Sequence, residues 1–159
     1  MRLSTIKGAS FGLTSGIITT LGMMMGLHSG TGSKMVVLGG ILTIAVADAF
    51  SDALGIHIAE EASNHHDDHR EVWQATIVTF ICKLFFASLF IIPVILFSLD
   101  VAMIVSIVWG LLVLGIISFF IAREQKNSAV HVIGEHISIA VIVIIATHYI
   151  GDLIARYFS

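Results

Sequence analysis

Residues 35–62 read MVVLGGILTIAVADAFSDALGIHIAEEA, and this stretch decides the fold class. Its apolar first half continues, without a proline or a turn signal, into a segment that carries two aspartates, a histidine and two glutamates. One helix is therefore predicted, about 42 Å long at a rise of 1.5 Å per residue. Because crossing a bilayer takes about 20 apolar residues, the stretch predicts a membrane-spanning helix that carries acids.

The whole chain has the composition of a membrane protein. Its 159 residues are 57% hydrophobic and 12% charged, whereas a soluble domain is about a quarter charged. The net charge of -3 gives no signal of nucleic-acid binding. The single cysteine, Cys82, lies in an apolar run and permits no intrachain disulfide. An all-α integral membrane protein is predicted.

Five apolar blocks are each long enough to span a bilayer. They cover, approximately, residues 9–27, 35–62, 73–97, 101–122 and 129–154. The links between them are short, so neighbouring helices are predicted to be antiparallel within one domain, residues 1–159. The only proline, Pro93, lies inside the third block and predicts a kink there.

Basic residues predict the orientation of the five spans. With the N-terminus inside, the cytoplasmic basic residues outnumber the external ones, and this favours an N-in, C-out topology. The cytoplasmic set is Arg2, Lys7, Arg70, Arg123 and Lys126, and the external set is Lys34 and Arg156. Short loops and the lack of an organelle signal favour a prokaryotic plasma membrane.

Asp48 and Asp52 are the most informative residues. At 100° per residue they share one narrow, small-sided helix face with Gly55, whereas His57 points roughly the opposite way from Asp48. An aspartate at the centre of a span costs about 2.5–3.5 kcal/mol, so the pair must face protein, water or a cation. Two interpretations remain open: an ion or proton pathway, and a structural salt bridge to Lys83.

Counting residues from the helix ends places several polar groups at one depth. Ser15, Asp52, Lys83 and Glu135 come from four different blocks and lie at similar distances from the cytoplasmic side. With Asp48, this layer holds three acids against one lysine. Such a layer is predicted to attract cations.

Histidines supply further candidate metal ligands. His131 and Glu135 are four residues apart on one helix face, and an imidazole with a carboxylate suits iron, manganese or zinc. His136 points elsewhere. The pair of His148 and Asp152 is predicted to form a local hydrogen bond.

The cytoplasmic end of residues 35–62 and the loop that follows it are also acidic and histidine-rich. Glu60 and Glu61 are predicted to reach water at the helix end. The following loop, NHHDDHRE at residues 64–71, includes His65 and His66. It is interpreted either as a solvated turn or as a segment that captures metal.

Glycines in the first block predict close helix packing. Gly8, Gly12 and Gly16 recur at every fourth residue, as do Gly22 and Gly26. Small residues at this spacing let helix backbones approach each other. The contact is expected either within one chain or between two copies.

Three segments resemble the vacuolar iron transporter family. GASFGLTSGIITTLGMMMGL, residues 8–27, is similar to the family's first helix, in which Gly-x-x-Asp-Gly precedes an apolar run. ADAFSDALGIHIAEEAS, residues 47–63, resembles the second helix with its Ser-Met-Ala-Ala-Gly-Glu-Tyr motif, and ATHYIGDLIAR, residues 146–156, resembles the closing segment. The resemblance implies a five-helix protomer that forms homodimers, with a path between protomers that exchanges iron or manganese for protons.

The departures from the family pattern bear on the substrate. Ser15 stands where the family has an aspartate, Asp52 where it has a metal-binding methionine, and Ile56 where it has a glutamate. The family's long cytoplasmic insert is replaced by the short His-rich loop. A carboxylate in place of a thioether makes the site harder and favours manganese.

Three functions follow as hypotheses. The first is a proton-coupled transporter of divalent iron or manganese that works as a homodimer. Its predicted metal-site residues are Asp48, Asp52, Glu135, His131, Ser15, His57, Glu60, Glu61, His65 and His66, with Lys83 for charge balance. No cofactor is expected beyond the transported ion, and the expected partners are a second copy, lipid and metal ions. The alternatives are a non-transporting scaffold, whose signature would be Asp52 paired directly with Lys83, and an intramembrane metal-dependent hydrolase.

Overall fold

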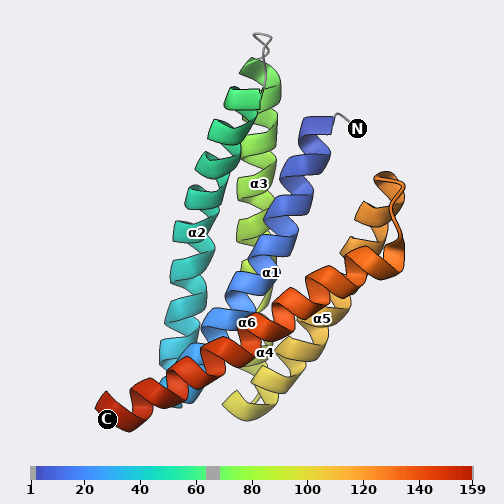
Figure 1. Cartoon of the computed structure of the whole chain (residues 1–159). Coiled ribbons are helices and arrows are strands. Elements are labelled where there is room, and N and C mark those ends of the chain that lie inside the picture. The colour runs from blue at the N-terminus through green and yellow to red at the C-terminus, as the bar shows by residue number, and fades with distance from the viewer. Residues whose placement is uncertain (1–2, 64–68, 159) are drawn as a thin grey trace.

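The computed structural model describes residues 3–63 and 69–158, which are almost entirely helical. The helices are α1 (Leu3–Thr31), α2 (Lys34–Ser63), α3 (His69–Leu89), α4 (Ile91–Leu96), α5 (Leu99–Glu124) and α6 (Ala129–Phe158), shown in Figure 1. With α3 and α4 counted together, five helices within these residues are long and apolar enough to cross a membrane. The prediction of an all-α chain with five such helices is confirmed.

The helices extend beyond the apolar blocks that predicted them. α1 begins at Leu3, α3 begins at His69 and α6 continues to Phe158, so each adds a turn or more of flanking residues. Hydropathy marks only the part of a helix suited to hydrocarbon, whereas the backbone hydrogen bonds continue through polar residues. The longer helices bring polar side chains of different helices into contact beyond the apolar blocks.

The third span is interrupted close to Pro93. α3 ends at Leu89 and α4 begins at Ile91, and the amide of Phe90 between them bonds to the carbonyl of Ala87 at 3.3 Å. Proline has no N–H, so the carbonyl of Leu89, four residues earlier, loses its helical donor. The predicted kink is confirmed, and it lies one turn before the proline.

α1 is the central helix, and its glycines bring two neighbours close. A Cβ on Gly12 would lie 2.6 Å from the carbonyl oxygen of Thr79 in α3. At Gly26 it would lie 3.4 Å from the carbonyl oxygen of Thr147 in α6. The predicted close packing is confirmed. At Gly12 and Gly26 the helices that approach α1 are α3 and α6 of the same chain.

α6 lies obliquely across α1, whereas α2 and α3 run alongside it (Figure 1). At the crossing, Ser29 of α1 donates a hydrogen bond to the carbonyl of His148 at 2.8 Å. A Cβ on Gly151 would collide with the carbonyl of Gly26 and lie 2.9 Å from the amide nitrogen of Gly30. The two backbones are therefore in direct contact.

Large apolar side chains cover the outward faces of the helices. Phe50, Ile116 and Ile142 are 62%, 50% and 65% exposed. A soluble protein rarely exposes apolar surface on this scale. The surface is compatible with an integral membrane protein.

Candidate functional site

A buried lysine joins three helices at the centre of the bundle. Lys83 of α3 is 1% exposed, and its ammonium group donates hydrogen bonds to Ser15 Oγ of α1 at 2.8 Å and to Asp52 Oδ2 of α2. The same ammonium lies 2.5 Å from Asp48 Oδ2. The predicted meeting of Ser15, Asp52 and Lys83 at one depth is confirmed.

Local sequence explains why these groups converge. Asp48 and Asp52 are one helical turn apart, so both carboxylates leave α2 on the same side. On α1, Gly16 faces Lys83, and a Cβ there would lie 3.5 Å from Lys83 Cγ. The same Cβ would lie 3.3 Å from the carbonyl oxygen of Lys83, so the glycine lets α3 approach α1 closely at this level.

The two aspartates differ in the hydrogen bonds that their carboxylates accept. Asp52 Oδ2 accepts hydrogen bonds from Lys83 and from Ser15 Oγ, the latter at 2.6 Å. Asp48 Oδ2 is within ion-pair distance of Lys83 but accepts no hydrogen bond from any described residue. Two carboxylates against one ammonium leave one negative charge in excess, and Asp48 is the acid with capacity for a further partner.

An open groove leads to Asp48. It has a volume of 430 Å³ and lies between α1 and α2. Its lining includes three polar residues of α2, Asp48, Thr43 and Ser51, together with Met23 of α1. Oxygen ligands of this kind suit hard cations, and a thioether suits softer ones.

The outer face of α2 beside this groove is built from small residues. They recur at every fourth position and are all exposed: Gly39, Thr43, Ala47, Ser51, Gly55 and Ala59. A Cβ on Gly39 or Gly55 would have nothing within 4 Å. Spacing of this kind permits a second helix to approach closely.

Ser15 provides a first mutational prediction. Ser15→Ala removes the hydroxyl that donates to Asp52 and accepts from Lys83, so the stability should fall by about 1–3 kcal/mol. Ser10→Ala, on the same helix, is the matched control and should change it by less than about 0.5 kcal/mol. Equal stabilities of the two variants in denaturant titrations would show that Ser15 does not support the cluster.

The expected exposure of Glu60 is wrong. Glu60 is 8% exposed and accepts a hydrogen bond from Lys7 of α1 at 2.9 Å. α1 starts early enough to pack beside the end of α2, and this contact covers the carboxylate. Glu61, the next residue, is exposed as predicted. The partnership with Lys7 was missed, although Lys7 precedes Ser15 by the same eight residues that separate Asp52 from Glu60.

Glu135 does not join the cluster. It pairs with His131 of its own helix at 3.2 Å, and the two side chains are 56% and 75% exposed. Both line an open groove formed by Ser128 and the first turns of α6. The predicted side-by-side placement of the two residues is confirmed, whereas the predicted layer is reduced to Ser15, Asp48, Asp52 and Lys83.

The remaining histidines are dispersed. His57 bonds Thr76 of α3 on another face of α2, His136 bonds Ser118 of α5, and His148 lies 3.5 Å from Asp152 of its own helix. His65 and His66 lie outside the described residues. Within residues 3–63 and 69–158, no three histidine, cysteine or acidic side chains converge as metal ligands.

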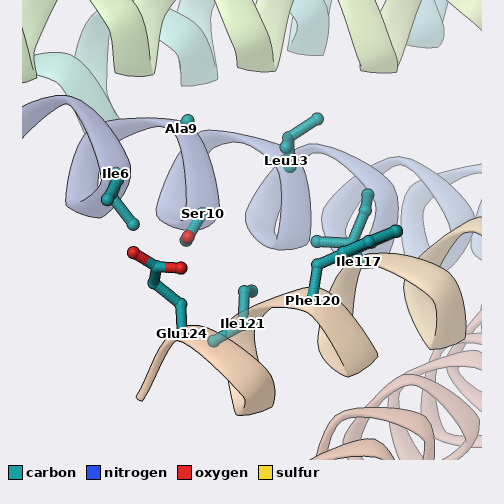
Figure 2. Close-up of a pocket in the computed structure, with 8 residues that line it drawn as sticks. All are labelled: Ile6, Ala9, Ser10, Leu13, Ile117, Phe120, Ile121 and Glu124. Atoms are coloured by element: carbon teal, nitrogen blue, oxygen red, sulfur yellow. The ribbon is translucent and has the colours of Figure 1, made fainter. Parts of the chain in front are cut away.

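A second groove, of 440 Å³, separates α1 from α5 near the start of α1. Figure 2 shows the carboxylate of Glu124 pointing across it toward Ser10, with Leu13 and Phe120 further along the groove. The lining provides one carboxylate and is otherwise mostly apolar. The Lys83 cluster is therefore the stronger candidate for a cation site.

Comparisons with known proteins return no match to any family model, to any curated protein or to any solved structure.

Proposed function

We propose that this chain is an integral membrane transporter of divalent transition metals, with Asp48 and Asp52 as the ion-binding carboxylates. The single observation that carries the proposal is the excess negative charge of the Lys83 cluster beside an open groove. A buried charge without a full counter-charge is costly, so a cluster of this kind favours a further cation. In an N-in, C-out protein of a prokaryotic plasma membrane, the cluster would lie near mid-bilayer.

Lys83 partly neutralises the two aspartates when the site holds no metal. When no metal is bound, its ammonium group offsets most of the repulsion between Asp48 and Asp52. A dication that enters from the groove would take over this role, and exchange against protons would return the site to its empty state. Carboxylate and hydroxyl oxygens favour manganese or ferrous iron over softer ions.

The site is proposed to be completed by a second copy of the chain. The exposed small-residue face of α2 borders the groove, so a two-fold partner packed there would enclose Asp48. This arrangement agrees with the resemblance to vacuolar iron transporters, of which the chain would be a divergent relative. The molecular mass of the detergent-solubilised protein tests the dimer.

Metal flux into proteoliposomes tests transport. Asp48→Asn combined with Asp52→Asn should lower manganese and iron uptake at least about tenfold, because the site loses its charged ligands. Asp100→Asn, which makes the same chemical change at an exposed acid of α5, should leave uptake unaltered. Unchanged uptake by the double variant, in protein that remains folded, would refute the proposal.

A non-transporting scaffold is the second candidate. The observation that favours it is the direct pairing of Asp52 with a lysine that is 1% exposed. A buried ion pair of this kind can have a purely structural role, in which it fixes the packing of the helices. The same flux assay separates the two functions, since a scaffold would transport no metal even as the unaltered protein.

A further inference from the structure

A groove between α2 and α3, on a different face of α2 from Asp48, contains a hydrogen-bond acceptor without a partner. The groove has a volume of 360 Å³, and its lining includes Phe50, Ala53, His57, Trp73, Thr76 and Phe80. Small-molecule sites in proteins have volumes of about 300–1,000 Å³ and are mostly apolar, with a few placed polar groups. This groove has both properties.

A short chain of hydrogen bonds fixes the state of the imidazole. Thr76 Oγ1 donates its only proton to the carbonyl of Val72 at 2.8 Å. With that proton committed to Val72, the 3.0 Å contact between Thr76 Oγ1 and His57 Nδ1 is assigned as one in which Nδ1–H donates. With this assignment, Nε2 of the neutral ring carries the lone pair, and the described residues supply no donor to it.

Two pairs of aromatic rings line the groove, at two levels along α2. His57 and Trp73 pack edge to face, with centroids 4.9 Å apart, and Phe50 and Phe80 lie 4.7 Å apart. The small side chain of Ala53 lies between these pairs along α2 and is buried. Walls of this kind favour a flat ring, because aromatic groups pack best edge to face or offset.

We propose that this groove binds a membrane-soluble phenol or quinol, whose ring hydroxyl donates to His57 Nε2 while its ring packs between the aromatic pairs. The lining contains no acid, lysine or arginine, so a charged ligand would be desolvated without compensation. A plain hydrocarbon chain would leave Nε2 unpaired. A neutral hydroxyl on an apolar ring satisfies both conditions.

Trp73 makes the groove directly observable. The chain has two tryptophans, Trp73 and Trp109, so Trp109→Phe leaves Trp73 as the only tryptophan fluorophore. The probe is a ring-brominated para-octylphenol, because bromine quenches tryptophan fluorescence on contact. The matched ligand is its methyl ether, which has the same ring, bromine and alkyl chain but no donor. Both are titrated into the full-length Trp109→Phe protein in lipid nanodiscs.

The phenol should quench Trp73 with a dissociation constant about twofold to tenfold lower than that of the ether, since one hydrogen bond separates them. His57→Phe should abolish this difference while leaving binding of the ether intact, which shows that the groove is still formed. Thr76→Val, which releases Nδ1, should reduce the difference. Equal quenching by the two ligands would mean that the groove holds only hydrocarbon, and would overturn the proposal. So would a phenol preference that survives His57→Phe, or the absence of saturable quenching.

Discussion

Lys83→Met is expected to lower the free energy of unfolding by about 3 kcal/mol, because it leaves two partly buried carboxylates side by side without their cation. The Asp48 and Asp52 side chains are only 25% and 18% exposed, so water replaces little of the lost interaction. Denaturant titration of the detergent-solubilised protein measures the change. Lys126→Met, at an exposed position after α5, is the matched control and should alter the value by less than about 0.5 kcal/mol.

A triple variant distinguishes two causes of the lost stability: the uncompensated charge of the aspartates and the lost packing of the Lys83 side chain. Adding Asp48→Asn and Asp52→Asn to Lys83→Met removes both uncompensated charges while nearly preserving volume. Most of the lost stability should return, since a buried ion cluster can be replaced at little cost once all its charges are removed. If the triple variant is no more stable than Lys83→Met alone, the lysine stabilises the bundle through its stem rather than its charge.

Gly151→Ala is the second change with a large expected effect. The added Cβ would collide with the carbonyl of Gly26 and lie 2.9 Å from the amide nitrogen of Gly30. These are backbone atoms, which no rotamer change can move aside. Relief requires α6 to shift away from α1, at a cost of about 1–3 kcal/mol.

Gly134→Ala provides the control within the same helix. A Cβ on Gly134 would meet nothing within 4 Å, so this substitution should stabilise the protein by up to about 1 kcal/mol through helix propensity. Thermal unfolding midpoints of the two variants should therefore move in opposite directions. A Gly151→Ala protein as stable as the parent would contradict the close crossing of α1 and α6.

The number of helices and the contact between Ser15, Asp52 and Lys83 could both be predicted from the sequence, for different reasons. Length and hydropathy predict spans because each backbone hydrogen bond must be satisfied within its own helix. Counting residues from the helix ends brought Ser15, Asp52 and Lys83 together correctly, since antiparallel helices share one depth scale. Depth does not specify rotation about the helix axis. Glu135 has a suitable depth but faces outward from α6.

The end of α2 shows a second limit. Glu60 was expected in water because it lies at the cytoplasmic end of the block 35–62, yet the ends of α1 and α2 pack against each other and cover it. Hydropathy carries no information on such contacts, which depend on how far each helix extends. The bond between His57 of α2 and Thr76 of α3 was also missed, because hydropathy does not identify the partner of a polar side chain on a neighbouring helix.

The ion pairs of Lys83 connect helices that are consecutive in the chain. α2 carries both aspartates, α3 carries the lysine, and the two helices follow each other directly in the order of elements. In a lipid environment, each helix alone would bring uncompensated charge into hydrocarbon, at about 2.5–3.5 kcal/mol for each residue. As a helical hairpin, the lysine of α3 would offset one of the two aspartates of α2 without any helix that follows them in the chain. The connectivity would thus favour insertion of α2 and α3 as a pair, in which one negative charge remains uncompensated instead of three separate charges.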